Sequence, residues 1–574
     1  MANTTFTSGT VIESSWLNDV NDATYEGTAV YTPTGTGAIA TTVQTKLRES
    51  VSVKDFGAVG DGVTDDRAAI VLALAYLTSG GTLYFPAGTY LVSAAITVPH
   101  GNLQMQGDGF NASVIKIAAS YADSTSLFDF SSVDNVEISD LGFNGNLANQ
   151  GISSTADNKQ IAIAIKGTSS NYSITRCYFK DWGKDGVYVQ TANNRRVTVS
   201  ECLFENTRRN GVTFIGGEQC QVVNCQFFLG KDQTNVVFNN GVHYEPNSAA
   251  DNLKGLIVKG NSFHDMQGGV MLYNSNGGTV SGVIVEGNEF ETITQRAAVV
   301  SYALGTAGIT ISGNRFRNCG NDASTSVTTD GGGIQFNQTA NAIITDNSFD
   351  NCTGFLGTVV NSGSAGRGTI IKNNLFTGDQ RGAIRLGYVN GSSSTGSLRQ
   401  IVGNICLGGG LDTANTYTAI SIANTVTHQG NGDVVLNNSI QISTTSGYGT
   451  GISVDQESGT SVVGQNAIVG STGAKYSFTN GTPTQLYDYS RDVSATIDPA
   501  SIANGGALST DVTVSGAAVG DQVIFSPGVN VSGLAATATV RGVNTVQLVL
   551  ANNTGAAVDL VSSTWKFKTI RPLV

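Results

Sequence analysis

The sequence predicts an all-β protein whose main body is a long parallel β-solenoid. Three observations predict this fold. A short β pattern ending in Asn-x-Phe recurs along the chain, a second short β run follows each copy, and the composition is polar but weakly charged. Only 13% of residues are charged, whereas 71 are glycine, which suits a sheet protein with many tight turns. The 40% of hydrophobic residues recur too regularly for a disordered chain.

The repeated signature is clearest at residues 256–263, 283–290 and 309–316. Weaker copies of the signature also occur, and their last residue, which is Phe in the clearest copies, is Phe, Cys or Ile. We call this residue the aromatic position; in the weaker copies it is Phe143, Phe179, Phe204, Phe227, Phe349, Phe376, Cys406, Ile440 or Ile468. The shortest interval, 23 residues from Phe204 to Phe227, fits one coil of a β-solenoid. Longer intervals indicate loops inserted between the strands of a coil.

The spacing within the signature gives each residue type a role. Alternate apolar residues, such as Val283 and Val285, must point inward. The Asn lies where the coil bends, and stacked coils would set these amides about 4.8 Å apart in a ladder. The aromatic residues would stack in the core. A second strand follows each copy, predicted at residues 186–189, 241–244, 333–336 and 451–454.

The seven cysteines are predicted to be free, buried thiols. Cys177, Cys202 and Cys225 take the place of the ladder Asn, and the remaining four fall at or near inward positions. The sequence shows no Cys/His spacing of the metal-binding kind, and no metal or cofactor is expected.

Both ends differ from the repetitive body. Residues 1–49 are Thr/Gly-rich around a short helical candidate at 15–20, and a helix predicted at 65–77 would cap the first coil. Asp61, Asp65 and Asp66 could form a calcium loop, but turn and N-cap chemistry accounts for them better. From about residue 487 the signature stops, and β runs at 511–514, 522–525 and 545–550 predict a small antiparallel sandwich. The expected domains are therefore residues 1–49, 50–486 and 487–574.

Composition also excludes some functions. The net charge of −12 argues against binding to a phosphate backbone. No apolar stretch is long enough for a transmembrane helix, and the N-terminal residues lack the features of a signal peptide. We therefore expect release by a route such as cell lysis.

Residues 51–66 (VSVKDFGAVGDGVTDD) and 81–90 (GTLYFPAGTY) resemble the opening of the pectate-lyase-like superfamily. Residues 16–20 and 46–49 look like the anchor of phage tailspikes, and residues 518–565 resemble the terminal sandwich of phage depolymerases. This resemblance implies a right-handed parallel β-helix, a homotrimer and attachment to the virion through the N-terminal part. It also implies activity at the host cell surface on a capsular or O-antigen polysaccharide. The short anchor suggests attachment through another tail protein.

Outward-facing side chains on stacked strands should form two columns that could bind a glycan. One column is expected to hold Tyr188, Thr213, His243 with Glu245, Met271 with Tyr273, Ser301, Gln335 with Asn337, and Arg385. The other is expected to hold Glu205, His264 with Asp265, Glu291, Arg317 and Asp350.

Glycoside hydrolysis needs two carboxyl groups, and stacked coils can supply the required separations. The candidate catalytic residues are Glu245, Asp265, Glu291 and Asp330, and the candidate substrate-binding residues are His243, Tyr273, Tyr302 and Arg385. Glu291 and Arg317 could instead form an ordinary pair between coils.

Three alternatives remain open at this point. A lyase would use His243, Tyr273 and Arg385 as its base and its carboxylate partner. A non-catalytic adhesin would grip glycan without shortening it. A secreted pectinase is disfavoured, because no signal peptide precedes the fold.

Overall fold

The computed structural model describes residues 29–570 apart from internal gaps. The gaps are 152–158, 191–194, 229–238, 275, 295–296, 304–306, 321–330, 338, 355–356, 362–367, 379–380, 387–397, 408–417, 424–432, 443–447, 456–460, 470–473, 480–484 and 488–490. The helical candidate at residues 15–20 lies outside the described residues. The chain divides into two units, residues 1–325 and 326–574, and each is described by itself.

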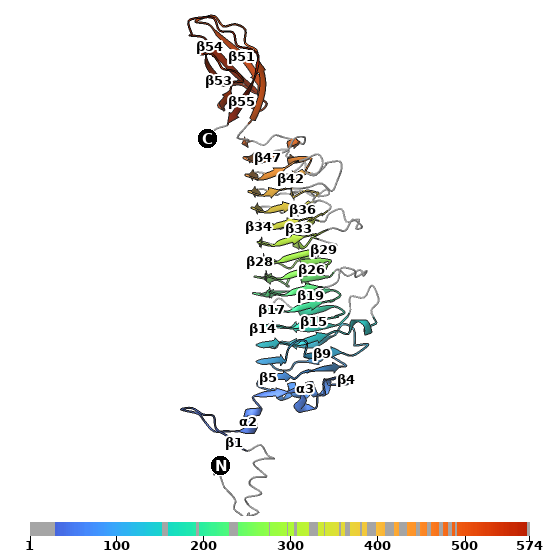
Figure 1. Cartoon of the computed structure of the whole chain (residues 1–574). Helices are drawn as coiled ribbons and strands as arrows, with labels where there is room; N and C mark the ends of the chain where they lie inside the picture. Colours follow the sequence, from blue (N-terminus) through green and yellow to red (C-terminus); the bar gives the residue numbers. More distant parts are fainter. Residues whose placement is uncertain are drawn as a thin grey trace, which may run out of the picture. The chain divides into compact units, whose positions relative to one another are not determined.

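The first unit is a parallel β-helix whose coils each contribute strands to three parallel sheets, as the stacked strands in Figure 1 show. The first sheet comprises β3 (Ser50–Ser52), β5 (Gly81–Phe85), β8 (Leu103–Gly107), β11 (Val136–Ser139), β14 (Ser170–Thr175), β17 (Arg195–Ser200), β20 (Gly217–Glu218), β21 (Gln221–Val223), β24 (Leu253–Lys254), β25 (Ile257–Lys259), β28 (Val280–Glu286) and β31 (Ala307–Ser312). The second comprises β4 (Asp61–Asp65), β6 (Gly88–Val92), β9 (Ser113–Ile117), β12 (Gly142–Asn144), β15 (Tyr178–Lys180), β18 (Leu203–Glu205), β22 (Gln226–Phe228), β26 (Ser262–Met266), β29 (Glu289–Ile293) and β32 (Arg315–Arg317). The third comprises β7 (Ile96–Thr97), β10 (Ser126–Ser131), β13 (Ile161–Lys166), β16 (Asp185–Val189), β19 (Asn210–Phe214), β23 (Asn240–Tyr244), β27 (Gly268–Asn274) and β30 (Val299–Ala303).

The second unit repeats this order of strands along its coils. Its first sheet comprises β34 (Ala340–Thr345), β37 (Ile370–Lys372), β40 (Gln400–Val402), β43 (Asp433–Leu436), β46 (Ser461–Gly464) and β49 (Gln485–Tyr487). Its second sheet comprises β35 (Ser348–Asp350), β38 (Leu375–Thr377), β41 (Ile405–Cys406), β44 (Ser439–Gln441) and β47 (Ala467–Val469). Its third sheet comprises β33 (Gly331–Asn337), β36 (Gly357–Asn361), β39 (Ile384–Leu386), β42 (Thr418–Ala423), β45 (Thr450–Asp455) and β48 (Ala474–Thr479). The predicted parallel β-helix is therefore confirmed in both units.

The predicted aromatic stack fills the core of the first unit. Six successive ring pairs from Phe143 to Phe316 have centroids 4.7 to 5.0 Å apart. In the second unit Phe376 pairs in register with Cys406, which in turn pairs with Ile440. The order of core positions that the sequence predicts is therefore the order observed.

Glycine at the start of the third-sheet strands makes room for this stack. A Cβ atom on Gly211 would lie 2.4 Å from the Phe227 ring, and one on Gly241 would lie 2.3 Å from the Phe263 ring. These distances are far below van der Waals contact, so the glycine of the Gly-Val pattern in β19 and β23 is a packing requirement.

The asparagine ladder is also confirmed. Asn261 donates its Nδ2 to Asn288 Oδ1 at 3.0 Å, and Asn288 donates to Asn314 Oδ1 at 2.9 Å. Each amide also donates to a carbonyl of the preceding coil, as Asn288 does to Val258 at 2.9 Å. The second unit repeats the ladder through Asn347, Asn374, Asn404, Asn438 and Asn466.

The seven cysteines are buried and free, as predicted. In the ladder the thiol replaces the amide as the donor to the preceding coil: Cys225 Sγ lies 3.6 Å from the Val199 carbonyl oxygen, and Cys202 Sγ lies 3.5 Å from that of Ile174. Burial raises the pKa of the Cys220 thiol to about 12, so this side chain stays neutral.

Helix α3 (Arg67–Tyr76) lies at the first coil, close to the predicted 65–77 (Figure 1). The acidic residues before it bind backbone amides rather than one another. Asp66 accepts from the Val59 and Gly60 amides at 2.6 and 3.1 Å, and Asp61 accepts from the Thr64 amide at 2.7 Å. Turn chemistry therefore accounts for these carboxylates, although the Asp66 side chain does not cap α3.

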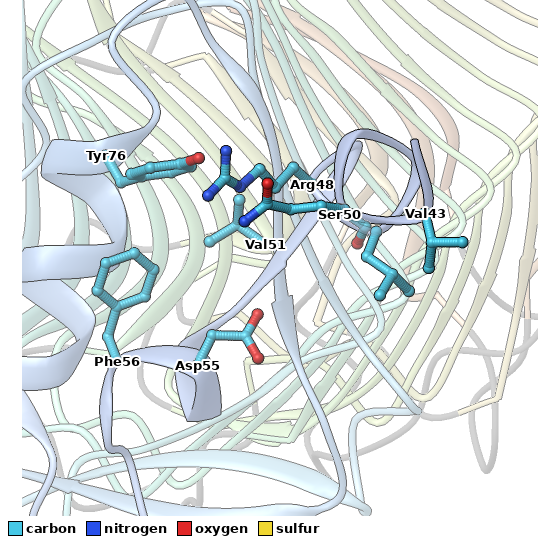
Figure 2. A pocket seen from close by; sticks show the side chains of 9 residues that line it. Val43, Arg48, Ser50, Val51, Asp55, Phe56 and Tyr76 are labelled. Carbon is cyan, nitrogen blue, oxygen red and sulfur yellow. The ribbon is translucent and has the colours of Figure 1, made fainter. Parts of the chain in front are cut away.

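The described N-terminal residues form β1 (Val30–Tyr31), paired antiparallel with β2 (Thr41–Thr42), and helix α2 (Val43–Leu47). The short 3₁₀ helices η1 and η2 span Val53–Phe56 and Leu147–Asn149. A pocket of about 480 Å³ lies beside α2, with Phe56 and Tyr76 on one side and Val43 on the other (Figure 2).

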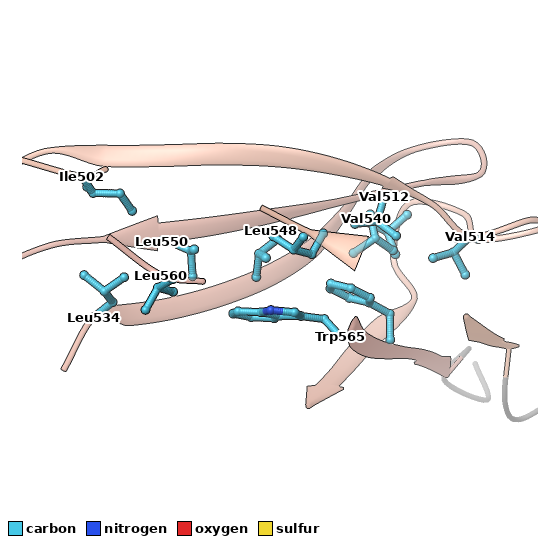
Figure 3. Close-up of a cluster of buried hydrophobic side chains, with 13 residues drawn as sticks. Ile502, Val512, Val514, Leu534, Val540, Leu548, Leu550, Leu560 and Trp565 are labelled. Carbon is cyan, nitrogen blue, oxygen red and sulfur yellow. The ribbon is translucent and has the colours of Figure 1, made fainter. Parts of the chain in front are cut away.

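The C-terminal residues form two three-stranded antiparallel sheets. One contains β50 (Arg491–Ile497), β55 (Ser563–Ile570) and β52 (Gln522–Ser526); the other contains β51 (Ala507–Thr513), β54 (Thr545–Ala551) and β53 (Ala535–Gly542). Both sheets contribute to one hydrophobic cluster, in which Trp565 lies opposite Leu548 and Val540 (Figure 3). The predicted strands at 522–525 and 545–550 fall within β52 and β54, whereas the one predicted at 511–514 covers only the end of β51 and one residue beyond it.

Candidate functional site

A solvent-facing row of side chains runs along the second sheet of the first unit, and we call it the outer stripe. Its members are in register on successive strands from β15 to β32 and are each 33% to 40% exposed: Lys180, Glu205, Phe228, His264, Glu291 and Arg317. The predicted column is therefore confirmed for Glu205, His264, Glu291 and Arg317, whereas its last member, Asp350, lies on β35 of the second unit.

Each end of the outer stripe is an ion pair. Lys180 Nζ lies 3.2 Å from Glu205 Oε1, and Arg317 Nη1 lies 3.0 Å from Glu291 Oε1. The Tyr178 hydroxyl also donates to Glu205. Partial burial opposes ionisation of Glu205, but the hydrogen bonds from Tyr178 and Lys180 outweigh it and lower the pKa of this carboxyl.

The centre of the outer stripe is aromatic. The Phe228 and His264 rings are stacked with their centroids 4.9 Å apart. Asp265 follows His264 in β26 with a left-handed backbone (φ 52°), and its Oδ2 lies 3.7 Å from His264 Nδ1. Two carboxylates, Asp265 and Glu291, therefore lie on neighbouring strands beside an exposed aromatic surface.

A second cluster of charged side chains, the buried cluster, lies at the third sheet of the same unit. The Arg209 guanidinium binds the Asp185 carboxylate through two hydrogen bonds of 2.9 and 2.6 Å. Its Nη1 also lies 3.3 Å from Glu245 Oε2, and His243 Nδ1 lies 3.8 Å from the same oxygen. Asp185 is fully buried, whereas Glu245 is 37% exposed, so the cluster reaches the surface at Glu245.

Amide and phenol groups complete the buried cluster. Asn210 Nδ2 lies 3.2 Å from His243 Nδ1, and the Asn210 backbone amide donates to Asp185 Oδ1 at 3.2 Å. The Tyr188 hydroxyl interacts electrostatically with the charged groups of Asp185, Arg209 and Glu245. Burial, with the neighbouring Asp185 carboxylate, raises the pKa of its hydroxyl to about 12, so Tyr188 is a neutral phenol at ordinary pH.

The predicted column on the third sheet needs two corrections. His243 is in register with Thr213, Met271 and Val300, whereas Ser301 pairs with Leu272 and points inward. The prediction that this column faces solvent is wrong for Thr213 and Met271, which are buried, and for His243, which is only 12% exposed. It is right for Glu245 and Tyr273, which are 37% and 40% exposed. The error arose because the alternation of residues along a strand predicts on which side of the sheet a side chain lies, but not which other residues cover that side.

The predicted site residues do not form one group. Asp265 and Glu291 lie on the second sheet, whereas Glu245 follows β23 of the third sheet. Tyr273 is 40% exposed and in register with Tyr302. Arg385 lies on β39 of the second unit, and Asp330 lies outside the described residues.

Three functional candidates were missed from the sequence: Asp185, Arg209 and Phe228. Asp185 and Phe228 lie beside residues already given a role, and Arg209 precedes a third-sheet strand. Alternation would have placed Phe228 outward, since its neighbour Phe227 is the core aromatic. In the described part of the chain no cluster of His, Cys, Asp or Glu has the arrangement of a metal site, and no helix there could span a membrane.

Comparisons with known proteins agree with the parallel β-helix. Residues 50–271 match the family described as rhamnogalacturonase A/epimerase, pectate lyase-like. Segments of the chain are similar to the plasmin and fibronectin-binding protein A of Streptococcus pneumoniae (32% identity over 27% of this chain) and the mannuronan C5-epimerase AlgE4 of Azotobacter vinelandii (50% over 12%). A further segment is similar to the preneck appendage protein of Bacillus phage PZA (35% over 21%). The chain spans only 24%, 13% and 14% of these relatives' own lengths.

The solved structures share the fold over nearly the whole chain. A tailspike protein double mutant of E. coli bacteriophage HK620, in complex with a pentasaccharide, superposes with a TM-score of 0.67 at 16% identity, covering 98% of this chain and 100% of that one. Fold and comparisons together show a parallel β-helix protein in which residues 50–271 are similar to a pectate-lyase-like family. Its fold is the one found in the tailspike protein of bacteriophage HK620.

Proposed function

We propose that this chain is a phage tailspike that recognises and depolymerises a bacterial capsular or O-antigen polysaccharide by glycoside hydrolysis. The observation that carries the proposal is the outer stripe: exposed acids, cations and aromatic rings in continuous register on a tailspike-like β-helix. Such a row offers hydrogen-bonding and stacking groups at the regular spacing that a polymer requires. A homotrimer attached to the phage tail through residues 1–49 belongs to the same proposal.

Asp265 and Glu291 are the favoured catalytic pair. They lie on neighbouring strands, where Glu291 is in register with His264, the residue before Asp265. Glycosidase carboxyl groups lie about 5–5.5 Å apart for retention or about 6.5–9.5 Å for inversion, and residues on neighbouring strands can reach such separations. One would protonate the leaving oxygen, and the other would act as nucleophile or activate water. Glu245, held by Arg209, and Asp330 remain the other candidate acids.

A lyase or epimerase is the second candidate, and the buried cluster favours it. Such chemistry needs a cation on the carboxylate of a uronic acid and a nearby group that exchanges a proton. Arg209 and His243 lie together beside the exposed Glu245. The similarity of one segment to a mannuronan C5-epimerase supports this alternative.

The test is incubation of the full chain with purified capsules and O-antigens from a panel of strains. Chain length, reducing ends and the ultraviolet absorbance of unsaturated uronates are followed together. Shortening with new reducing ends and no absorbance is expected. Shortening with absorbance would indicate a lyase, a change of sugar composition without shortening would indicate an epimerase, and binding without any change would leave a receptor-binding adhesin.

The residues are tested in the same assay. Asp265→Asn and Glu291→Gln are each expected to lower kcat by a factor of about 10² or more, because acid–base catalysis contributes about 10²–10⁴. Glu289→Gln is the matched control, since Glu289 lies on the same strand, two residues before Glu291, and pairs with Arg315 at 3.3 Å. Loss of activity in Glu245→Gln alone would move the catalytic site to the buried cluster.

A further inference from the structure

We propose that Phe228 and His264 form a platform on which one uncharged pyranose ring of the glycan stacks. The inference rests on the proposed function and deepens it, because it names a subsite and the class of sugar that this subsite takes. The two rings are stacked with their centroids 4.9 Å apart, and both side chains are accessible to solvent, with exposures of 38% and 40%.

Phe228 lies on the outside of the sheet and is 38% exposed. Its neighbour Phe227 is the core aromatic, fully buried between Phe204 and Phe263 at 4.7 and 4.8 Å. The equivalent positions on the adjacent strands hold a charged residue, Glu205, and an ionisable one, His264. A phenylalanine in this polar row exposes apolar area to water, and covering that area with a ligand would be favourable.

An aromatic face attracts the C–H face of a sugar. The ring face carries the negative part of the aromatic quadrupole, and the C–H groups along one face of a pyranose carry small positive charges. Hydroxyl groups at the edge of that sugar would need polar partners. Gln226 and Ser262, which are in register with each other, lie on the same side of the sheet two residues before Phe228 and His264.

The charges around the platform select an uncharged sugar. Glu205 and Glu291 are the next stripe residues on either side of the two rings, and Asp265 follows His264. Their cations, Lys180 and Arg317, lie one strand further away, at the ends of the outer stripe. A uronic acid on the platform would therefore meet carboxylates first, whereas a hexose or N-acetylated amino sugar could donate hydroxyl or amide hydrogens to them.

The test measures binding of the full chain to the purified polysaccharide that it binds most tightly in the strain panel. Phe228→Ala is expected to raise the dissociation constant about tenfold or more, and Phe228→Tyr is expected to leave it nearly unchanged. Ile284→Ala is the matched control, because Ile284 is 36% exposed on the first sheet, away from the outer stripe. It should bind as the unchanged protein does.

A second readout does not depend on how Phe228→Ala folds. The chain has only four histidines, so selective isotope labelling gives a simple spectrum in which His264→Gln assigns the His264 signal. Added polysaccharide is expected to shift that signal. An unshifted His264 signal, with unchanged affinity in Phe228→Ala and normal depolymerisation, would overturn the platform and leave the proposed function standing.

Two further outcomes also decide the question. If the recognised polysaccharide consists of uronic acids alone, the assigned sugar class is wrong. If the unchanged protein binds no polysaccharide in the panel, the proposed function fails and the platform fails with it.

Discussion

Arg209 and Asp185 form a bidentate ion pair that is almost completely removed from solvent, with side-chain exposures of 8% and 0%. The remaining guanidinium nitrogen of Arg209 reaches outward to Glu245. A buried carboxylate thus fixes an arginine, and the arginine in turn orients a carboxylate at the surface. Such support from behind is how a protein holds a surface functional group in one geometry.

Asp185→Ala should destabilise the protein strongly, because it leaves the Arg209 charge buried without its main partner. The expected loss is about 3–5 kcal/mol, seen as a lower apparent melting temperature. Asp140→Asn is the control, because the backbone of Asp140 is left-handed (φ 59°), a conformation that asparagine tolerates and alanine disfavours. It breaks the geometrically similar pair of Asp140 with Arg176, whose side chain is 50% exposed, so the expected loss is at most about 1 kcal/mol. Equal losses in the two variants would contradict the importance of burial.

Phe227→Ala and Phe228→Ala should differ sharply although the residues are adjacent. Phe227 lies inside the aromatic stack, so its removal leaves a cavity and should cost about 3–5 kcal/mol. Phe228 faces solvent, and its removal should change stability by no more than about 0.5 kcal/mol. Thermal unfolding of the two variants under one condition measures the difference. A large loss in Phe228→Ala would mean that the platform is a structural element.

The core of the β-helix could be predicted because each position repeats under the same constraint. Phe204, Phe263 and Phe290 occupy one place in successive coils, so alternation and spacing alone fix their order. The ladder could be predicted for the same reason, including the cysteines, since a small buried donor fits where Asn288 fits.

The candidate site could be predicted only in part. The repeats in the sequence predicted the outer stripe, because alternation along a strand determines which side chains lie on the same face of the sheet. The repeats could not predict the buried cluster, because the pairing of Arg209 with Asp185 depends on the conformation of the corner between two sheets. The prediction also failed at Ser301, where an inserted loop changed the count of residues between the aromatic and the next strand.

Cys225→Asn should be tolerated better than Cys225→Leu. Cys225 lies next to the end of the asparagine ladder: its backbone amide already donates to Asn261 Oδ1 at 2.8 Å. An asparagine there could donate to the Val199 carbonyl that the thiol now approaches, and so extend the ladder by one coil. Leucine would fill the site without a donor and is expected to overpack it, at a cost of about 1–3 kcal/mol. Melting temperatures of both variants decide this, and a lower value for asparagine would contradict it.

The pair of Asp140 with Arg176 should make a small part of the stability dependent on pH. Hydrogen bonds from Arg176 lower the pKa of the Asp140 carboxyl below its usual value. A group whose pKa is lower in the folded state contributes stability above its unfolded pKa, about 3.9 for Asp, and loses it as the pH falls through the folded value. Asp140→Asn should therefore be less stable than the unchanged protein at neutral pH, and the difference should shrink below about pH 4. Melting temperatures of both proteins across that range measure it. Added salt should reduce the difference at neutral pH, because the pair is exposed, and a difference that grows on acidification would show that the stabilising form of Asp140 is the protonated one.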